Sequence, residues 1–411
     1  MLTWTFVFCF QDYFEILAEM IAVRKSLCVL NGTWRNYSSQ IFQQESSCQR
    51  GPCIPLAGRE YLAGSDDMSC PARLEYATQD NYDLFRLSPG QDMVTLADVA
   101  TEISEVVRSH LCNKGALLFK GLSGVIKDNP SFSFMAAKQG EKFSYTAGFA
   151  TREEFGDAPG NKHFSEEYQE KVLTVEGVMA AADDPPEVTI EPHLEMSYNK
   201  EMPGKIMFYC HHAPLPHEGG QTPICDMRKV YQDLTQHPIL QPLLTEGLRY
   251  YRTLPSRNSS QGSLYSWEKT FFTEDRKSVE KTLTELGYDM EWTREGSLRY
   301  SYLMSAVRPH PRSGELVWAN QSSVSHGSYY LHLPTILYPD PEFAPSHTAH
   351  RDGTPFSREE LAIIRRVQWE QSRAVVWEEG DLLVLDNHAV GHGRMGFHPH
   401  TDRNLVVAIA K

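Results

Sequence analysis

The sequence contains three pairs in which an acidic residue follows a histidine by two positions, and one of them lies in a strand-like stretch. His193 and Glu195 belong to residues 188–196, where β-branched residues and a proline favour extended backbone. Side chains two positions apart on a strand point to the same face, so the imidazole and the carboxylate are expected to converge. Such a pair supplies two of the three ligands of a 2-His-1-carboxylate site, which binds non-haem Fe(II) and leaves coordination positions open. A second, distant histidine must complete the site.

The spacing of such a pair is weak evidence by itself. With 16 histidines and 53 acidic residues among 411, about two pairs arise by chance. His350 and Asp352 lie in a turn-rich string that more readily ends a loop than lines a strand. His400 and Asp402 have no histidine after them in the sequence. The pair within residues 188–196 is therefore the best first half of a metal site.

The second half of the site is predicted close to the last strand-like run. Residues 381–392 read as a hydrophobic strand that leads into a polar turn and presents His388 and His392. His388, within the turn, is expected to face solvent. Arg403 follows at the start of the last run, residues 405–410. His392 is the candidate third ligand.

These separated elements, taken together, resemble the TauD/TfdA family of Fe(II)- and 2-oxoglutarate-dependent dioxygenases, particularly its clavaminate-synthase-like branch. The resemblance covers residues 84–411. Four elements in the right order are more specific than any one of them. They are the H-x-D/E pair at His193 and Glu195, the Gly-Gly-x-Thr at Gly219 to Thr222, the D-N-x-x-x-x-H at Asp386, Asn387 and His392, and the later Arg403.

The resemblance implies a role for each matching residue. His193, Glu195 and His392 would be the catalytic metal ligands. The cosubstrate 2-oxoglutarate would chelate the iron, and its far carboxylate would meet the planar fork of Arg403 and the hydroxyl of Thr222. Arg394 competes for the same carboxylate. Because it lies two residues after the metal ligand, we expect it beside the cosubstrate site or in contact with substrate.

The implied reaction consumes O2, converts 2-oxoglutarate to succinate and CO2, and hydroxylates an unactivated C–H bond of a small molecule. Glu195 favours a hydroxylase over the related halogenases, which carry a small residue at this position. Oxidative cyclisation or desaturation is an alternative within the family, and a catalytically silent jelly-roll binding protein is an alternative from another class. Ser197, Tyr198, Asn199 and Asn320 could line a substrate pocket or form turns and caps. The substrate itself cannot be read from the sequence.

The elements that must position these residues are mainly short strands. Residues 94–111 have helical spacing, and residues 116–119 follow as a buried strand. Helices are also predicted at 276–286 and at 357–366, where Ser357 opens a capping box. Many short strands with helical insertions predict a double-stranded β-helix, or jelly roll. The further predicted strands are residues 205–210, 248–253, 315–319, 374–377, 381–385 and 405–410.

The composition and the first residues of the sequence limit which partners and which cellular location we expect. The net charge of −14 disfavours nucleic acid and anionic membrane as partners, because both require an excess of Lys and Arg. The apolar opening has neither the basic flank of a secretory signal nor the length of a membrane span, so we expect a cytoplasmic protein. Reduced thiols are the favoured interpretation of the cysteines, and a zinc module or a disulfide framework near the start of the chain is the alternative. Residues 1–83 are treated as an extension of unknown role, with five of the eight cysteines in the first 70 residues. The oligomeric state cannot be inferred.

Overall fold

The computed structural model describes residues 41–44, 54–55, 73–88, 94–143, 177–182, 184–186, 188–258, 266–330 and 344–411. The cysteines of the first 70 residues lie outside these ranges. No helix within the described residues has the length and apolar character needed to cross a membrane.

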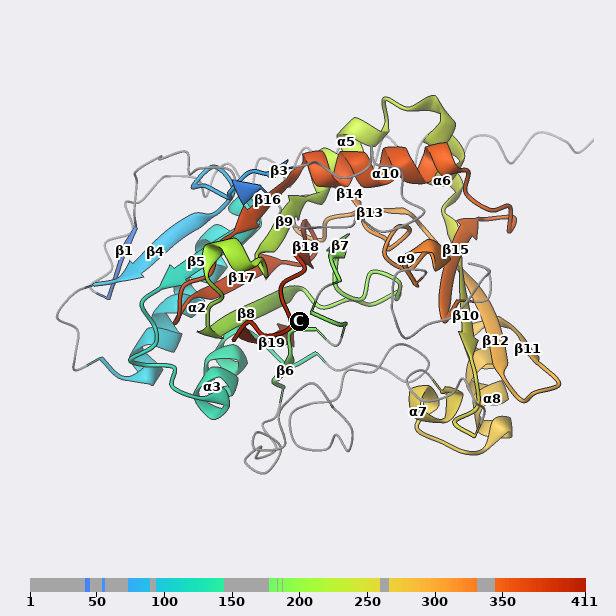
Figure 1. Cartoon of the computed structure of the whole chain (residues 1–411), viewed down its shortest axis with the longest axis horizontal. Coiled ribbons are helices and arrows are strands. Elements are labelled where there is room, and N and C mark those ends of the chain that lie inside the picture. Colours follow the sequence, from blue (N-terminus) through green and yellow to red (C-terminus); the bar gives the residue numbers. More distant parts are fainter. Residues whose placement is uncertain are drawn as a thin grey trace, which may run out of the picture.

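A large sheet forms one wall of the molecule (Figure 1). Neighbouring strands in it are antiparallel except for β4 and β5, which are parallel. In spatial order its strands are β1 (Phe42–Gln44), β4 (Asp83–Leu87), β5 (Ala116–Lys120), β17 (Leu382–Asp386), β8 (Lys205–His212), β19 (Asn404–Ala410) and β6 (Met179–Ala180).

A smaller antiparallel sheet faces the large one. Its order is β16 (Ser372–Val375), β9 (Thr222–Asp226), β18 (Val390–Arg394) and β7 (Ile190–His193). Phe208 and Leu383 from the large sheet and Ile224 and Val390 from the small one belong to the same buried cluster. Two antiparallel sheets packed around a shared core form the predicted jelly roll, which confirms that prediction.

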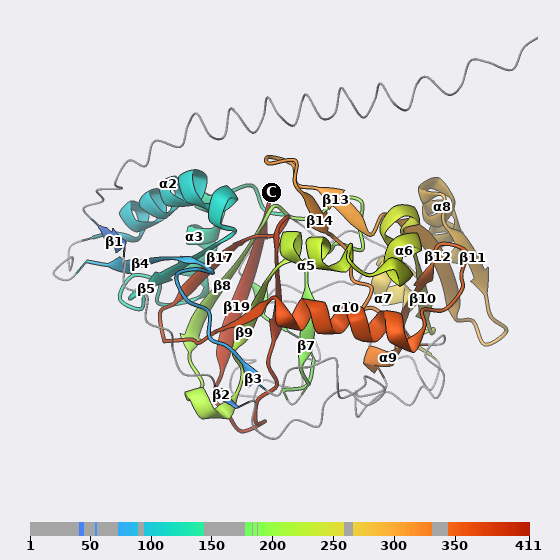
Figure 2. The ribbon, with the colours of Figure 1, turned by 90° about the horizontal axis from the view of Figure 1, so that it is seen from above.

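Helices cover the outer face of the large sheet. α2 (Leu96–Lys114) and α3 (Asn129–Gln139) lie on the side of the large sheet away from β9 (Figure 2). Side chains alternate along β8: Phe208 points to the small sheet, while Met207 and Tyr209 pack with the two helices. Both faces of β8 are therefore buried, which explains its nearly continuous apolar sequence.

An insertion beside the jelly roll contributes a third sheet, with the order β11, β12, β10 and β15 (right side of Figure 1). Most of its helices pack with it in one buried cluster, which also includes Leu194 from the segment after β7. Its strands are β10 (Leu248–Leu254), β11 (Asp289–Trp292), β12 (Leu298–Met304) and β15 (Ser346–His350), and the helices are α5 (Met227–Leu234), α6 (Gln241–Glu246), α7 (Trp267–Phe271), α8 (Arg276–Leu286), α9 (Gly327–Tyr330) and α10 (Arg358–Glu370). Smaller elements are the antiparallel strand pairs β2 (Ile54–Pro55) with β3 (Arg73–Leu74) and β13 (Val307–Pro309) with β14 (Leu316–Trp318), and the 3-10 turns η1 (Pro216–Glu218) and η2 (Pro238–Leu240).

Described pieces of residues 1–83 pack onto the jelly roll. β1 pairs with β4 at the edge of the large sheet, and Tyr76 bridges Ala374 at the edge of the small one. Leu74 joins a buried cluster with Trp369 and Met395. The division between an extension and a domain beginning at residue 84 remains a prediction.

Candidate metal centre

His193, Glu195 and His392 converge at one point between the sheets. A carboxylate oxygen of Glu195, Oε2, lies 3.8 Å from His193 Nε2 and 3.6 Å from His392 Nε2. The three ligand atoms lie within 4.8 Å of one another. Two ligand atoms that are each ~2.1 Å from one ion lie at most about 4.2 Å apart, so both distances suit a shared metal. The donor set of two imidazoles and one carboxylate is that of a non-haem Fe(II) site.

The local backbone differs from the predicted strand. β7 ends at His193, and Glu195 lies in the turn that follows. Met196 has a φ of 58°, in the left-handed region that favours glycine. The side chains of His193 and Glu195 therefore converge because the chain turns sharply after the histidine. The prediction that both residues lie on one face of a continuous strand was wrong.

The orientation of His193 is set by its own strand. Its Nδ1 lies 2.8 Å from the carbonyl oxygen of Glu191. A carbonyl can only accept, so Nδ1 carries the proton and Nε2 keeps its lone pair for a metal. The Glu191 carboxylate forms a buried ion pair with Arg365 of α10, with Nε and Oε1 2.9 Å apart. A helix of the insertion is thus linked to the strand that carries the first ligand.

Asn387 holds the backbone of Glu195 in place. The amide N–H of Glu195 donates to Asn387 Oδ1 at 2.7 Å, and Asn387 Nδ2 donates to the carbonyls of Glu195 at 3.0 Å and Pro203 at 2.8 Å. Asn387 is fully buried, so these bonds are shielded from water. Asn387 is part of the D-N-x-x-x-x-H motif, but the sequence did not indicate what its side chain does.

Two glutamines also hold the metal-binding segment. Gln368 Nε2 donates to the carbonyl of Pro192, and Gln321 Nε2 donates to that of Leu194, each at 3.0 Å. Both glutamines are buried. Sequence reasoning missed them because a lone glutamine in a helix or loop carries no spacing signal.

A candidate anion site lies where β9 and β19 begin. Thr222 Oγ1 accepts a hydrogen bond from Trp377 Nε1 at 3.0 Å, which leaves its own hydroxyl hydrogen available to donate. Arg403 Nε donates to the carbonyl of Gly220 at 2.9 Å. A Cβ on Gly220 would lie 2.8 Å from Arg403 Cδ, so only glycine leaves room for this arginine.

Arg394 neighbours this site but is already bonded. Its two Nη atoms donate to the carbonyls of Asp184, Pro185 and Val188. The guanidinium groups of Arg394 and Arg403 lie over the same ring, that of Phe397. Burial and the nearby Arg394 lower the pKa of Arg403 to about 9. The two neighbouring guanidinium groups make the local potential positive, which favours binding of an anion at Arg403.

Residues 83–409 match the sequence model of the "Taurine catabolism dioxygenase TauD, TfdA family". The chain belongs to the TauD/TfdA family. Its members are Fe(II)- and 2-oxoglutarate-dependent dioxygenases, and the predicted enzyme class and cofactors are therefore confirmed for this chain.

Two curated relatives of this TauD/TfdA protein are each 30% identical to it over the aligned residues. The dapdiamide synthesis protein DdaC of Enterobacter agglomerans is 30% identical over 319 residues, which cover 75% of this chain and 88% of the relative. A clavaminate synthase-like protein of Arabidopsis thaliana is 30% identical over 238 residues, covering 57% of this chain and 68% of the relative. Among solved structures, PvcB of Pseudomonas aeruginosa has 16% identity and a TM-score of 0.42, with 83% of this chain and 88% of that one covered.

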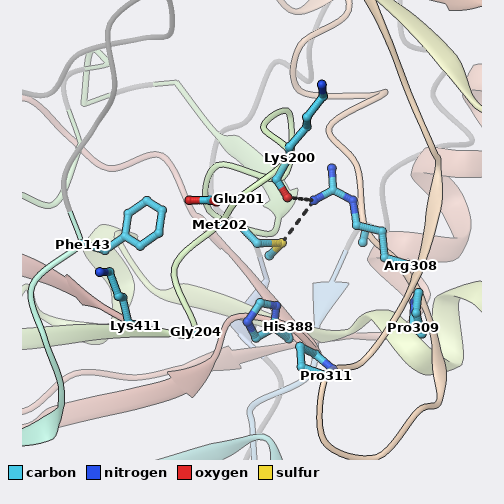
Figure 3. A pocket seen from close by; sticks show the side chains of 11 residues that line it. Phe143, Lys200, Glu201, Met202, Gly204, Arg308, Pro309, Pro311, His388 and Lys411 are labelled. Carbon is cyan, nitrogen blue, oxygen red and sulfur yellow. Dashed lines mark hydrogen bonds between the residues drawn. The ribbon is translucent and has the colours of Figure 1, made fainter. Parts of the chain in front are cut away.

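A pocket of about 410 Å³ lies next to the metal-binding segment of this TauD/TfdA enzyme (Figure 3). The three metal-site residues are not among those that line it. Arg308 lines the pocket and donates to the carbonyl of Ser197 at 2.7 Å, which fixes the turn after Glu195. His388 also lines it and is half-buried, so the prediction that His388 faces solvent was wrong.

A second cluster of potential metal ligands comprises Cys112, His310 and Asp386. There, His310 Nδ1 accepts from the backbone N–H of Ser313 at 3.1 Å, so its proton is on Nε2. That proton points to Asp386 Oδ2 at 3.1 Å. Burial raises the pKa of Asp386, but the hydrogen bonds with His310 and with the backbone N–H of His388, together with the electrostatic effects of both histidines, outweigh burial, so the pKa is lowered. His310 has no lone pair to offer, and we interpret the cluster as structural.

Proposed function

We propose that this enzyme hydroxylates an unactivated C–H bond of a small molecule, with His193, Glu195 and His392 as the ligands of Fe(II). The convergence of these three side chains carries the proposal, because their separations suit one ion. When bound, Fe(II) and 2-oxoglutarate would activate O2 and oxidise the substrate, with release of succinate and CO2.

We assign the far carboxylate of 2-oxoglutarate to Arg403 and Thr222. The Arg403 guanidinium keeps Nη donors for a carboxylate while its Nε is bonded to Gly220. Thr222 can add a hydroxyl donor because Trp377 occupies the acceptor side of its oxygen. Arg394, with its Nη atoms on backbone carbonyls, would support this site and strengthen its positive potential without touching the cosubstrate.

Neighbouring residues would hold the metal ligands in position before the substrate binds. The Glu191 carbonyl keeps His193 in the tautomer that binds metal, and Asn387 fixes the backbone of the carboxylate ligand. Phe208 lies against His392, with ring centroids 5.0 Å apart, and keeps water away from that ligand's face. Glu195 fills the coordination position that a halogenase would leave for a halide, which supports hydroxylation.

Anaerobic titration with Fe(II) and 2-oxoglutarate tests the proposal. We expect a visible charge-transfer absorption in the wild-type protein, its loss in Glu195→Ala, and its retention in Glu201→Ala, which changes an exposed glutamate of the same segment. Arg403→Gln should weaken 2-oxoglutarate binding about 10- to 100-fold while Fe(II) binding persists. A folded wild-type protein that gives no such absorption, or a Glu195→Ala variant that behaves like wild type, would overturn the assignment.

A further inference from the structure

The strand that carries His193 is held partly by side chains from the insertion. β7 is the last strand of the small sheet and pairs with β18. Gln368 Nε2 donates to the carbonyl of Pro192, and Gln321 Nε2 donates to that of Leu194, each at 3.0 Å. Both glutamines belong to the insertion, so the position of the first ligand depends on the insertion as well as on the sheet.

Helix α10 contacts β7 through two side chains of one face. Arg365 and Gln368 are three positions apart, so they lie side by side on the helix surface. Arg365 Nε lies 2.9 Å from Oε1 of Glu191, and Gln368 bonds to the next residue of the strand, Pro192. Apolar residues of α10 pack in the buried cluster of the insertion, which fixes the helix itself. α10 therefore holds two successive residues of β7 immediately before the first ligand.

Folding stability alone does not explain the ion pair between Arg365 and Glu191. The two side chains are 2% and 1% exposed. Within the described residues, neither Arg365 Nε nor either carboxylate oxygen of Glu191 has a partner in hydrogen-bond geometry. Removing two charges from water is costly, and a pair without hydrogen bonds on the carboxylate offsets that cost poorly. Apolar side chains of similar size would give comparable or greater stability at this place.

The contacts of Glu191 connect the ion pair with the metal ligand. Its carboxylate meets Arg365, while its backbone carbonyl accepts from His193 Nδ1 at 2.8 Å. Arg365 is fixed from its other end, because Nη2 donates to Ser328 Oγ at 2.9 Å. An apolar contact could slide along the strand, whereas two opposite charges have one arrangement of lowest energy. The pair thus fixes the carbonyl that orients the imidazole.

We infer that Arg365 is a positioning residue of the metal centre, acting through Glu191 on the orientation of His193. The inference rests on the proposed function, because it takes His193 as an iron ligand. With Nδ1 held by the Glu191 carbonyl, the Nε2 lone pair has one direction, and groups that orient a ligand in this way control metal affinity. A charged pair from the insertion therefore sets part of the geometry of a site built on the jelly roll.

Replacing both charges with apolar side chains separates positioning from stability. The double variant Glu191→Leu/Arg365→Met leaves no unpaired buried charge, so we expect it to unfold, free of metal, at a temperature no lower than either single variant. Its dissociation constant for Mn(II) should nevertheless rise about 10-fold, as measured from the electron paramagnetic resonance signal of the free ion. The charge-transfer absorption with Fe(II) and 2-oxoglutarate, recorded without oxygen, should shift or weaken.

Two further variants complete the comparison. Arg366→Met is the matched control, because Arg366 is the half-exposed neighbour of Arg365 on α10, and it should behave like wild type in all three measurements. Arg365→Lys keeps the charge but loses the planar fork that reaches both Glu191 and Ser328. We expect this variant to fold and to have a Mn(II) affinity between those of the wild type and the double variant.

The outcomes distinguish the inference from the proposed function. Failure of the folded wild-type protein to bind Mn(II) would overturn both. Normal binding by the wild type, with the same affinity and absorption in a folded double variant, would overturn only the inference, since the pair would then be purely structural. Should the double variant fail to fold, wild-type affinity and absorption in Arg365→Lys would overturn it instead.

Discussion

His193 and His392 are register partners on neighbouring antiparallel strands, although they come from distant parts of the chain. Their rings are 4.6 Å apart, and the pairing of β7 with β18 shifts register immediately after His392. The strand pairing that builds the small sheet therefore also brings the two imidazoles together. The candidate metal centre depends on the close approach of these two backbones.

Glycines on both sides of His392 allow this approach, and their replacement should separate the strands. A Cβ at position 393 would lie 2.4 Å from the Ile190 carbonyl oxygen, which is backbone and cannot move aside. Gly393→Ala should therefore cost about 3 kcal/mol of unfolding free energy and weaken Mn(II) binding. Chemical denaturation and metal titration would measure both effects.

Gly391→Ala provides an informative comparison. Its Cβ would lie 2.2 Å from Met227 Cε, the flexible end of a side chain. We expect a smaller cost, about 1–2 kcal/mol, and partial rescue by Met227→Leu, which removes the clashing methyl. Equal costs for the two glycine variants, with no rescue, would show that the close contacts of β18 do not control stability.

Asn387→Ala should impair metal binding without removing a ligand. The variant loses three hydrogen bonds to the segment of Glu195 and Pro203, so the carboxylate ligand is no longer held. Affinity for Mn(II) should fall about 10- to 100-fold, as for other groups that orient metal ligands. Asn113→Ala, an exposed residue of α2, is the control and should bind like wild type. An Asn387→Ala protein that is folded and binds Mn(II) normally would contradict this account.

Metal removal should destabilise the folded protein. An ion that binds only the folded state, present at 100 times its dissociation constant, adds about 2.7 kcal/mol to the unfolding free energy. A chelator should lower the unfolding midpoint of the wild-type protein and leave that of Glu195→Ala nearly unchanged. A similar chelator effect on both proteins would place the stabilising ion elsewhere.

Acid should destabilise the insertion through His326. This buried histidine accepts a hydrogen bond at Nδ1 from the N–H of Ser328, and burial with nearby His347 and Arg365 lowers its pKa from 6.5 to about 2. The folded state thus binds fewer protons than the unfolded state. The contribution of His326 to stability is complete above pH 6.5 and is lost as pH falls below it, by about 1.4 kcal/mol per pH unit. Denaturation between pH 7.5 and 5.5 should show a shallower pH dependence for His326→Asn than for wild type.

The sequence predicted the parts of the site that have fixed types and spacing. The ligand pair, the distal histidine, the arginine and the threonine were all chosen from such patterns and stay predictions, whereas the jelly roll indicated by the short strands with turn residues is confirmed. The capping box at Ser357 also correctly marked the start of α10. These signals are local, so a single sequence is enough to reveal them.

What the sequence could not show depends on contacts between distant segments. Asn387 bonds to a residue 192 positions away, and Gln368 to one 176 positions away, and neither has a local pattern. The turn at Glu195 replaces the expected strand because Asn387 and Gln321 hold it from outside.

The bond between Glu195 and Asn387 also affects how the protein can acquire its metal. Before the last strands have folded, the H-x-E pair has neither the third ligand nor the amide that holds its carboxylate, and two loosely held donors retain a divalent ion poorly. Closing a loop of 192 residues must therefore precede tight binding. With the ligands assigned as proposed, an unfinished chain would hold iron only weakly.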